Sequence, residues 1–159
     1  MREGRDVADD GLLDEGTETA ALNEVVAAEH AAVWGYGTVG AALPGDARGP
    51  AAAAEVAHRD ARDRLVAVLE SRGADPAPRE AGYTLPFPVL SAVDAATLAV
   101  VLEEGVSAAW VRLLDQSAEP AVRELAVEEL AAAEVRAVGW RTAAGRIPVT
   151  SAFPGLPQG

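Results

Sequence analysis

The 159-residue sequence carries a net charge of −12, half of its residues are apolar, and it contains no cysteine. The length suits one domain with a sizeable core, and the lack of cysteine excludes disulfides and thiolate metal ligands. A strongly acidic surface repels nucleic acid and anionic membranes, so neither is expected as a partner. Neither a signal peptide nor a membrane-spanning apolar run is found in the sequence, and we expect a cytoplasmic protein.

Helical patterns and end signals predict two helices in the first half of the chain. The first begins near Thr17 or Thr19, either of which can cap it, and runs to about Leu43. The second has Pro50 in its first turn, where a missing N–H is harmless. It ends at Gly73, a residue suited to a left-handed helix cap.

Two further helices are predicted in the second half. The third begins near Ser91, where Ser-x-x-Asp resembles a capping box, and continues to about Asp115. The fourth restarts the chain just before Pro120 and reaches about Ala144. The residues that follow contain too much proline and glycine for a helix, and an extended strap is expected there.

The link between the second and third helices is long, roughly 19 residues, enough to run the length of a bundle. The fold class predicted is therefore an all-α, ferritin-like four-helix bundle, up-down-down-up, with one long crossover. A plain up-down bundle with a mobile loop is the alternative; the apolar stretch GYTLPFPVL favours an ordered crossover. The predicted organisation is a disordered acidic segment (1–16), the bundle (17–145) and an extended tail (146–159).

Several polar side chains fall on the core faces of these helices. Helical spacing directs Glu29, His58, Glu103 and Glu134 towards the bundle axis, each from a different helix, and Glu55 forms Glu-x-x-His with His58. The crossover topology places them at similar heights. Carboxylates and imidazoles that converge in this way are typical of iron and manganese sites in helical bundles. These five residues are the candidate metal ligands.

Motifs along nearly the whole chain resemble one known family. They are AEHAAVWGYG (28–37), HRDARDRL (58–65), YTLPFPV (83–89), VRAVGWR (135–141) and AFPGLP (152–157). The chain is similar to an actinobacterial ferritin-like family known as a domain of unknown function, within the ferritin-like superfamily. The resemblance implies the bundle and brings no established activity. In the superfamily a first-helix Glu followed seven residues later by Tyr often belongs to the metal site, and Glu29 and Tyr36 have that spacing.

One departure from the two-metal pattern leaves two interpretations open. Ala137 stands where a second Glu-x-x-His would place its histidine, so one half of the site lacks a nitrogen ligand. The competing interpretation is a buried polar network, in which Glu29, His58 and Glu103 bind one another with Arg62 or Arg136 as counter-ion.

Two neighbours of the candidate ligands have their own alternatives. Glu55 lies four residues before Arg59, a spacing that favours a surface ion pair slightly over metal ligation. His30 follows Glu29 but points about 100° away around the helix, and it is assigned with Tyr36 and Arg136 to the surroundings of the site.

The predicted function is a helical bundle of unknown physiological role that acts as a structural or binding protein, with no catalytic residue assigned. The alternative is a protein that binds iron or manganese and has oxidoreductase or iron-handling activity. Alanine-rich faces and glycines in the first helix would let a second bundle approach closely, so a homodimer is expected.

Overall fold

The described part of the chain is all-α, as predicted. The computed structural model describes the backbone of residues 9–157 and the side chains of residues 16–157. Its helices are α1 (Asp9–Ala42), α2 (Gly49–Ser71), α3 (Ala92–Gln116) and α4 (Pro120–Ala143), with a short 3-10 helix, η1 (Gly45–Ala47), before α2. Within these described residues, no helix combines the length and the apolar character needed to cross a membrane.

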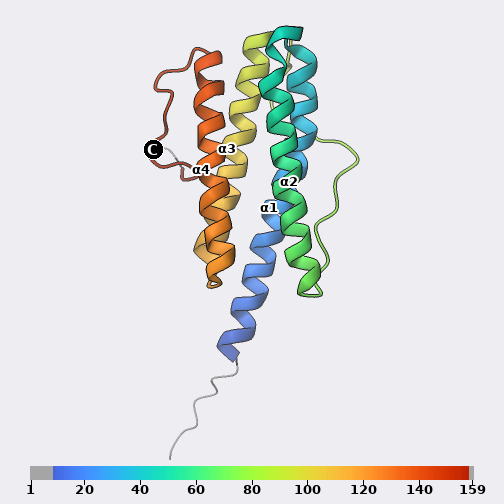
Figure 1. The fold of residues 1–159 in the computed structure, drawn as a ribbon, viewed down its shortest axis with the longest axis vertical. Helices are drawn as coiled ribbons and strands as arrows, with labels where there is room; N and C mark the ends of the chain where they lie inside the picture. Colours follow the sequence, from blue (N-terminus) through green and yellow to red (C-terminus); the bar gives the residue numbers. More distant parts are fainter. Residues whose placement is uncertain (1–8, 158–159) are drawn as a thin grey trace, which may run out of the picture.

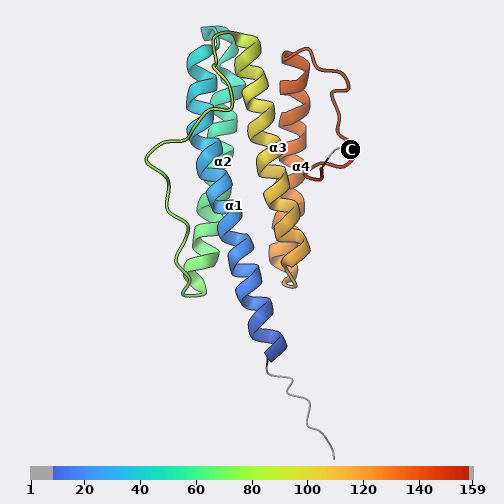
Figure 2. The ribbon, with the colours of Figure 1, turned by 180° about the vertical axis from the view of Figure 1, so that it is seen from behind.

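The four helices lie side by side along one long axis. Figures 1 and 2 show α1 and α4 running towards one end of the bundle, and α2 and α3 running towards the other. Extensive contacts join α1 with α2, α1 with α3, and α3 with α4. Therefore α1 and α3 form the centre of the array, and α2 and α4 flank it.

The connection between α2 and α3, residues 72–91, is an ordered crossover that carries the chain back along the bundle (Figures 1 and 2). Leu85, Phe87 and Val89 pack against the buried apolar residues of one half of the core. Tyr83 contacts the ring of Trp34 instead, with ring centroids 5.6 Å apart. The apolar side chains of the stretch GYTLPFPVL therefore lie on the bundle, as an ordered crossover requires.

The first helix begins earlier than predicted. It starts at Asp9, so the expected start at Thr17 or Thr19 is wrong, and part of the segment expected to be disordered is helical. Residues 1–8 of that segment lie outside the described residues.

The predicted signals at the ends of α2 and α3 are confirmed. Gly73 has a φ of 69°, in the left-handed region, and the amide of Ala74 donates to the carbonyl of Leu69 at 3.0 Å. This is the hydrogen bond of a Schellman cap. At the start of α3, the Ser91 hydroxyl accepts from the Asp94 amide at 3.1 Å.

The core consists of two apolar clusters, one in each half of the bundle. One includes Leu65 and Trp110, the other includes Leu98, and all three residues are at most 1% exposed. Along α2 and α3, residues of the two clusters lie on either side of His58 and Glu103. The buried polar side chains therefore occupy a layer between two apolar regions.

After α4 the chain folds back as a strap, residues 144–157, which Figure 1 shows beside α4. Its backbone forms turns and bends. The amide of Ser151 donates to Glu134 Oε1 at 3.1 Å, and Arg141 donates to the carbonyl of Val149 at 3.1 Å. Two charged side chains of α4 thus hold the strap by its backbone.

Candidate functional site

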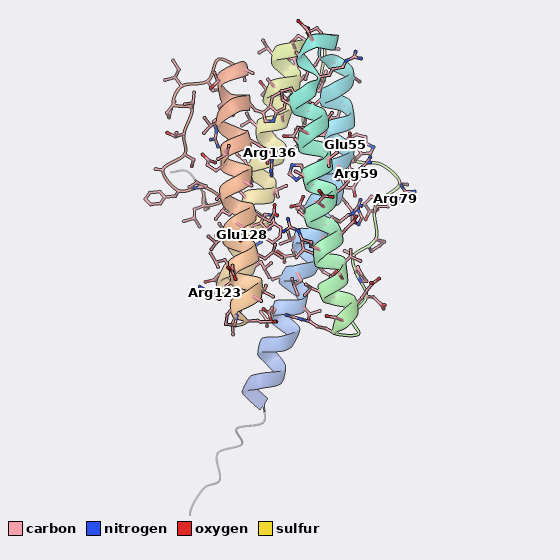
Figure 3. All side chains as sticks on the ribbon, in the orientation of Figure 1. Glu55, Arg59, Arg79, Arg123, Glu128 and Arg136 are labelled. Atoms are coloured by element: carbon pink, nitrogen blue, oxygen red, sulfur yellow. The ribbon has the colours of Figure 1, made fainter. Side chains whose placement is uncertain are left out.

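Each of the four helices contributes one charged side chain to a buried cluster, which we call the core cluster: Glu29 from α1, His58 from α2, Glu103 from α3 and Arg136 from α4. His58 Nδ1 lies 2.7 Å from Glu29 Oε2, and His58 Nε2 lies 3.1 Å from Glu103 Oε1. Arg136 Nε donates to the same Glu103 oxygen at 2.9 Å. Figure 3 labels Arg136 on α4. A single hydrogen-bonded network therefore links all four helices.

Two aromatic side chains complete the network. The hydroxyl of Tyr36 donates to Glu103 Oε1, and Trp110 Nε1 donates to Glu29 Oε1 at 2.9 Å. The ring of Tyr36 also stacks on His58, with centroids 5.3 Å apart and an interplanar angle of 26°. Of the carboxyl oxygens in the cluster, Glu103 Oε2 is buried and has no hydrogen-bond partner.

The geometry of His58 fits its protonated form. A neutral imidazole donates from only one nitrogen, whereas both nitrogens of His58 face carboxyl oxygens. Burial alone would lower the pKa of His58, but the hydrogen bonds to Glu103 and Glu29 and the charges of both residues outweigh it and raise the pKa to about 9. The imidazolium therefore donates to both neighbours at neutral pH.

The same contacts act on Glu103 and Tyr36. Burial would raise the pKa of Glu103, but the hydrogen bond and charge of His58, together with Arg136, lower it. Burial and the neighbouring Glu103 both raise the pKa of the Tyr36 hydroxyl, which remains a donor. An imidazolium and a guanidinium thus face two carboxyl groups, and the formal charges in the core cluster balance.

Arg136 connects the core cluster to the surface. Glu29, His58 and Glu103 are at most 1% exposed, whereas the side chain of Arg136 is 19% exposed. Arg136 lines a groove of about 510 Å³ whose walls include Leu43 and other mainly apolar residues from the ends of several helices. Solvent therefore reaches the cluster first at the guanidinium.

Two of the predicted ligands lie outside the core cluster. Glu55 pairs with Arg59 on the surface of α2, at 2.5 Å, because the one-turn spacing brings their side chains together. Glu134 pairs with Arg141 at 2.7 Å and accepts from the strap, so its predicted place among the ligands is wrong. The arginine two turns along α4 directs that carboxylate towards the strap.

Of the three residues predicted to surround the site, two belong to the core cluster and one does not. Tyr36 and Arg136 belong to the core cluster, as described. His30 does not, because its Nε2 lies 3.2 Å from the carbonyl of Ala77 in the crossover. Arg62, the other proposed counter-ion, pairs with the neighbouring Asp63 at 2.7 Å. Sequence spacing alone did not distinguish the two arginines.

Two functional contacts were not predicted. The donation of Trp110 to Glu29 was not predicted; the place of Trp110 two turns after Glu103, on the same face of α3, was the available signal. Arg141 is only 5% exposed and contacts both Glu134 and Glu104, at 2.7 and 3.3 Å. The seven-residue spacing of Glu134 and Arg141 could have indicated that pair.

The core cluster does not offer a metal the ligands it needs. Both nitrogens of His58 already face carboxyl oxygens, and Arg136 places a cation beside Glu103. Among the carboxyl oxygens of the core cluster, only Glu103 Oε2 is buried without a hydrogen-bond partner. Within the described part of the chain, no group of three or more histidine, aspartate and glutamate side chains is arranged to hold a metal ion. The donor set, as it is arranged, does not fit an iron or manganese centre.

Comparisons with known proteins match nearly the whole chain. A family model described as "Domain of unknown function (DUF4439)" matches residues 21–158, which include every member of the core cluster. The chain is similar to a solved structure, that of a conserved hypothetical protein, rv2844, from Mycobacterium tuberculosis. The two are 35% identical, the match covers 80% of this chain and 96% of that chain, and the TM-score is 0.78. No curated protein matches the chain significantly.

Proposed function

Because the chain belongs to the DUF4439 family, a domain of unknown function, we propose a role from its own residues: a ferritin-like bundle that acts as a structural or binding protein. In this proposal the core cluster holds the four helices together by charge pairing rather than through a metal. The observation that carries it is that each helix supplies one charged side chain, two cations and two carboxyl groups.

Two features support the ferritin-like assignment. A single long connection joins α2 to α3, and the two helices run in the same direction (Figures 1 and 2). Polar side chains also converge at one level of the bundle, where ferritin-like proteins build metal sites. In this chain an arginine on α4 contributes the second positive charge at that level, beside Glu103.

The proposed role of the cluster is to fix how the helices pack. An apolar interface tolerates sliding and rotation of one helix against another, because dispersion contacts are not directional. The hydrogen bonds of His58 and Arg136 are directional and buried, and loss of either partner leaves an uncompensated charge. The cluster therefore favours one register of α2 and α4 relative to Glu103.

Metal analysis of the purified protein tests this proposal. Protein prepared without chelator or metal-affinity tag is analysed for iron and manganese, then loaded anaerobically with each and melted. We expect substoichiometric metal and an unchanged Tm, because binding to the native state alone would raise Tm. Near-stoichiometric iron or manganese that disappears in Glu29→Ala would overturn the proposal and favour the metal-binding alternative.

A homodimer remains a prediction. Its support is the pair Val93 and Val135, which line the same mainly apolar groove and are 56% and 74% exposed. Burial of such side chains between two copies is favourable. Light scattering coupled to gel filtration measures the mass, and a monomer at high concentration would rule the dimer out.

A further inference from the structure

A second site lies on the surface beneath the crossover, on the far side of α1 and α2 from Arg136. It is a pocket of about 780 Å³, here called the crossover pocket, with walls from α1, α2 and the crossover. Figure 3 shows Glu55, Arg59 and Arg79 on this side of the molecule, where the crossover passes α2. Its volume is in the range of small-molecule sites.

The crossover pocket concentrates positive charge on an acidic protein. Three arginines and two glutamates line it, which gives a net positive charge of one in a chain of net charge −12: Arg59, Arg62, Arg79, Glu55 and Glu80. Arg59 is paired with Glu55 and Arg62 with Asp63. Among the described residues, Arg79 has no hydrogen-bond or ion-pair partner, so its guanidinium is available to a ligand.

The response of His30 is consistent with a positive field in the pocket. Burial is the main cause that lowers the pKa of His30; the hydrogen bond to Ala77 and the charge of Asp63 raise it, and the charges of Arg62 and Arg79 lower it. His30 also holds the crossover through the carbonyl of Ala77, which keeps the arginine-bearing segment close to α1. The positive charge is therefore placed by contacts between the crossover and α1.

Aromatic rings form another part of the wall. Trp34 is 38% exposed, whereas Trp110 and Trp140 are 0% and 7% exposed. Trp34 and Tyr83 meet with centroids 5.6 Å apart at an interplanar angle of 49°, which leaves ring surface open to the pocket. Aromatic faces favour offset or tilted packing with another ring.

We propose that the crossover pocket binds a small aromatic anion, whose ring packs on Trp34 and Tyr83 and whose carboxylate or phosphate pairs with Arg79. Two oxygens of a carboxylate or of a phosphate match the two-pronged donor geometry of a guanidinium. A long polyanion is disfavoured by the charge of the whole protein, so the ligand is a single small molecule. This site is separate from the core cluster and does not depend on whether that cluster binds metal.

Calorimetric titration with matched probes tests the chemistry. Adenosine monophosphate and benzoate carry both a ring and an anion, adenosine lacks the anion, and cyclohexanecarboxylate lacks the aromatic ring. We expect saturable binding of at least one of the first two, and at least tenfold weaker binding of its matched neutral or non-aromatic counterpart. Tighter binding of adenosine monophosphate identifies the ligand as a phosphate, and tighter binding of benzoate identifies it as a carboxylate. No saturable binding of either, or equal binding of the counterparts, would refute the proposal.

Variants locate the site. Arg79→Ala should weaken binding at least tenfold, whereas Arg146→Ala, which makes the same change of charge at an exposed position in the strap, should leave it unchanged. Tryptophan emission excited at the red edge should change on binding in the wild type and not in Trp34→Phe, because the other two tryptophans are buried. Equal effects of Arg79→Ala and Arg146→Ala would place the ligand elsewhere and refute the proposal. The metal experiment on the core cluster has no bearing on these outcomes.

Discussion

His58 Nδ1 lies 2.7 Å from Glu29 Oε2 across the interface of α1 and α2, and each residue is only 1% exposed. A charged hydrogen bond in such a place is shielded from solvent, so the protonation of the ring is coupled to folding. The second nitrogen of the same ring faces Glu103. The protonation state of His58 is therefore the main property through which pH affects the stability of this core.

The free energy of unfolding should fall as pH rises from about 6.5 to about 9. The pKa of His58 is about 9 in the folded protein and 6.5 as its ordinary value, so the native state holds the proton more tightly. Its contribution is fully present below pH 6.5 and is lost as pH rises through 9, an effect on the order of 3 kcal/mol. Urea unfolding across this pH window measures the slope.

His58→Gln is the control for that slope. Glutamine keeps one donor but has no proton to lose, so the variant should be less stable by about 1–3 kcal/mol at pH 6 and nearly insensitive to pH up to 9. A wild-type profile that is flat over the same window would show that His58 is not held as a cation.

Glu29→Gln should lower the pKa of His58. The Glu29 hydrogen bond and charge both raise that pKa, and loss of an opposite charge in contact should move it from about 9 to about 7–8. Imidazole NMR signals report the titration directly, and the only other histidine, His30, is identified with His30→Gln. The control is Glu55→Gln, which changes a carboxylate on the outer side of α2. An identical shift in both variants would contradict the contact.

Arg136→Ala should be much more destabilising than Arg59→Ala, although each removes one arginine from one ion pair. Arg136 compensates Glu103, which is fully buried, so its loss should reduce the free energy of unfolding by about 2 kcal/mol or more. Arg59 is 54% exposed and pairs with Glu55 along one helix, a contact worth only about 0.3–0.5 kcal/mol.

A double-mutant cycle separates the pair from other effects of the arginine. In a Glu103→Gln background, Arg136→Ala should reduce the free energy of unfolding by less than it does in the wild type. The coupling energy between the two changes should be about 1–3 kcal/mol. Additive effects of the two changes would mean that Arg136 stabilises α4 through packing alone.

Helical periodicity placed Glu29, His58 and Glu103 correctly because all three lie on faces rich in apolar residues, where burial leaves little choice of direction. It failed for Glu134, which lies at the margin of such a face, whereas the surface ion pair of Glu55 with Arg59 had been predicted as an alternative to ligation. At such a margin, an ion pair with a nearby arginine can turn a flexible side chain away from the core. The helical period of 3.6 residues does not show which of the two directions the side chain takes.

The sequence could not predict, for a different reason, that Glu103 pairs with Arg136 rather than with Arg62. Arg62 and Arg136 were equally possible counter-ions by spacing. The neighbouring Asp63 binds Arg62, and the position of α4 beside α3 brings Arg136 to Glu103. Such a choice depends on how helices pack, and no local pattern in the chain encodes it.

Gly155→Ala should release the strap from the bundle. Gly155 has a φ of 78°, and a Cβ there would lie 2.5 Å from the backbone oxygen of Ser107 on α3, which cannot move without disturbing the helix. The positive φ alone disfavours alanine by about 1–2 kcal/mol. The collision adds to this, so detachment of the strap becomes the easier response.

Exchange of the Ser151 amide measures that detachment, because this amide donates to Glu134 Oε1 and is protected only while the strap is docked. Gly145→Ala is the matched control: Gly145 has a φ of 68°, but a Cβ there meets no atom within 4 Å. Both variants carry the backbone strain, and only Gly155→Ala adds the collision. We therefore expect exchange at Ser151 to rise by roughly tenfold more in Gly155→Ala than in Gly145→Ala, as an added 1.4 kcal/mol requires. Equal exchange rates in the two variants would show that contact with α3 does not hold the strap in place.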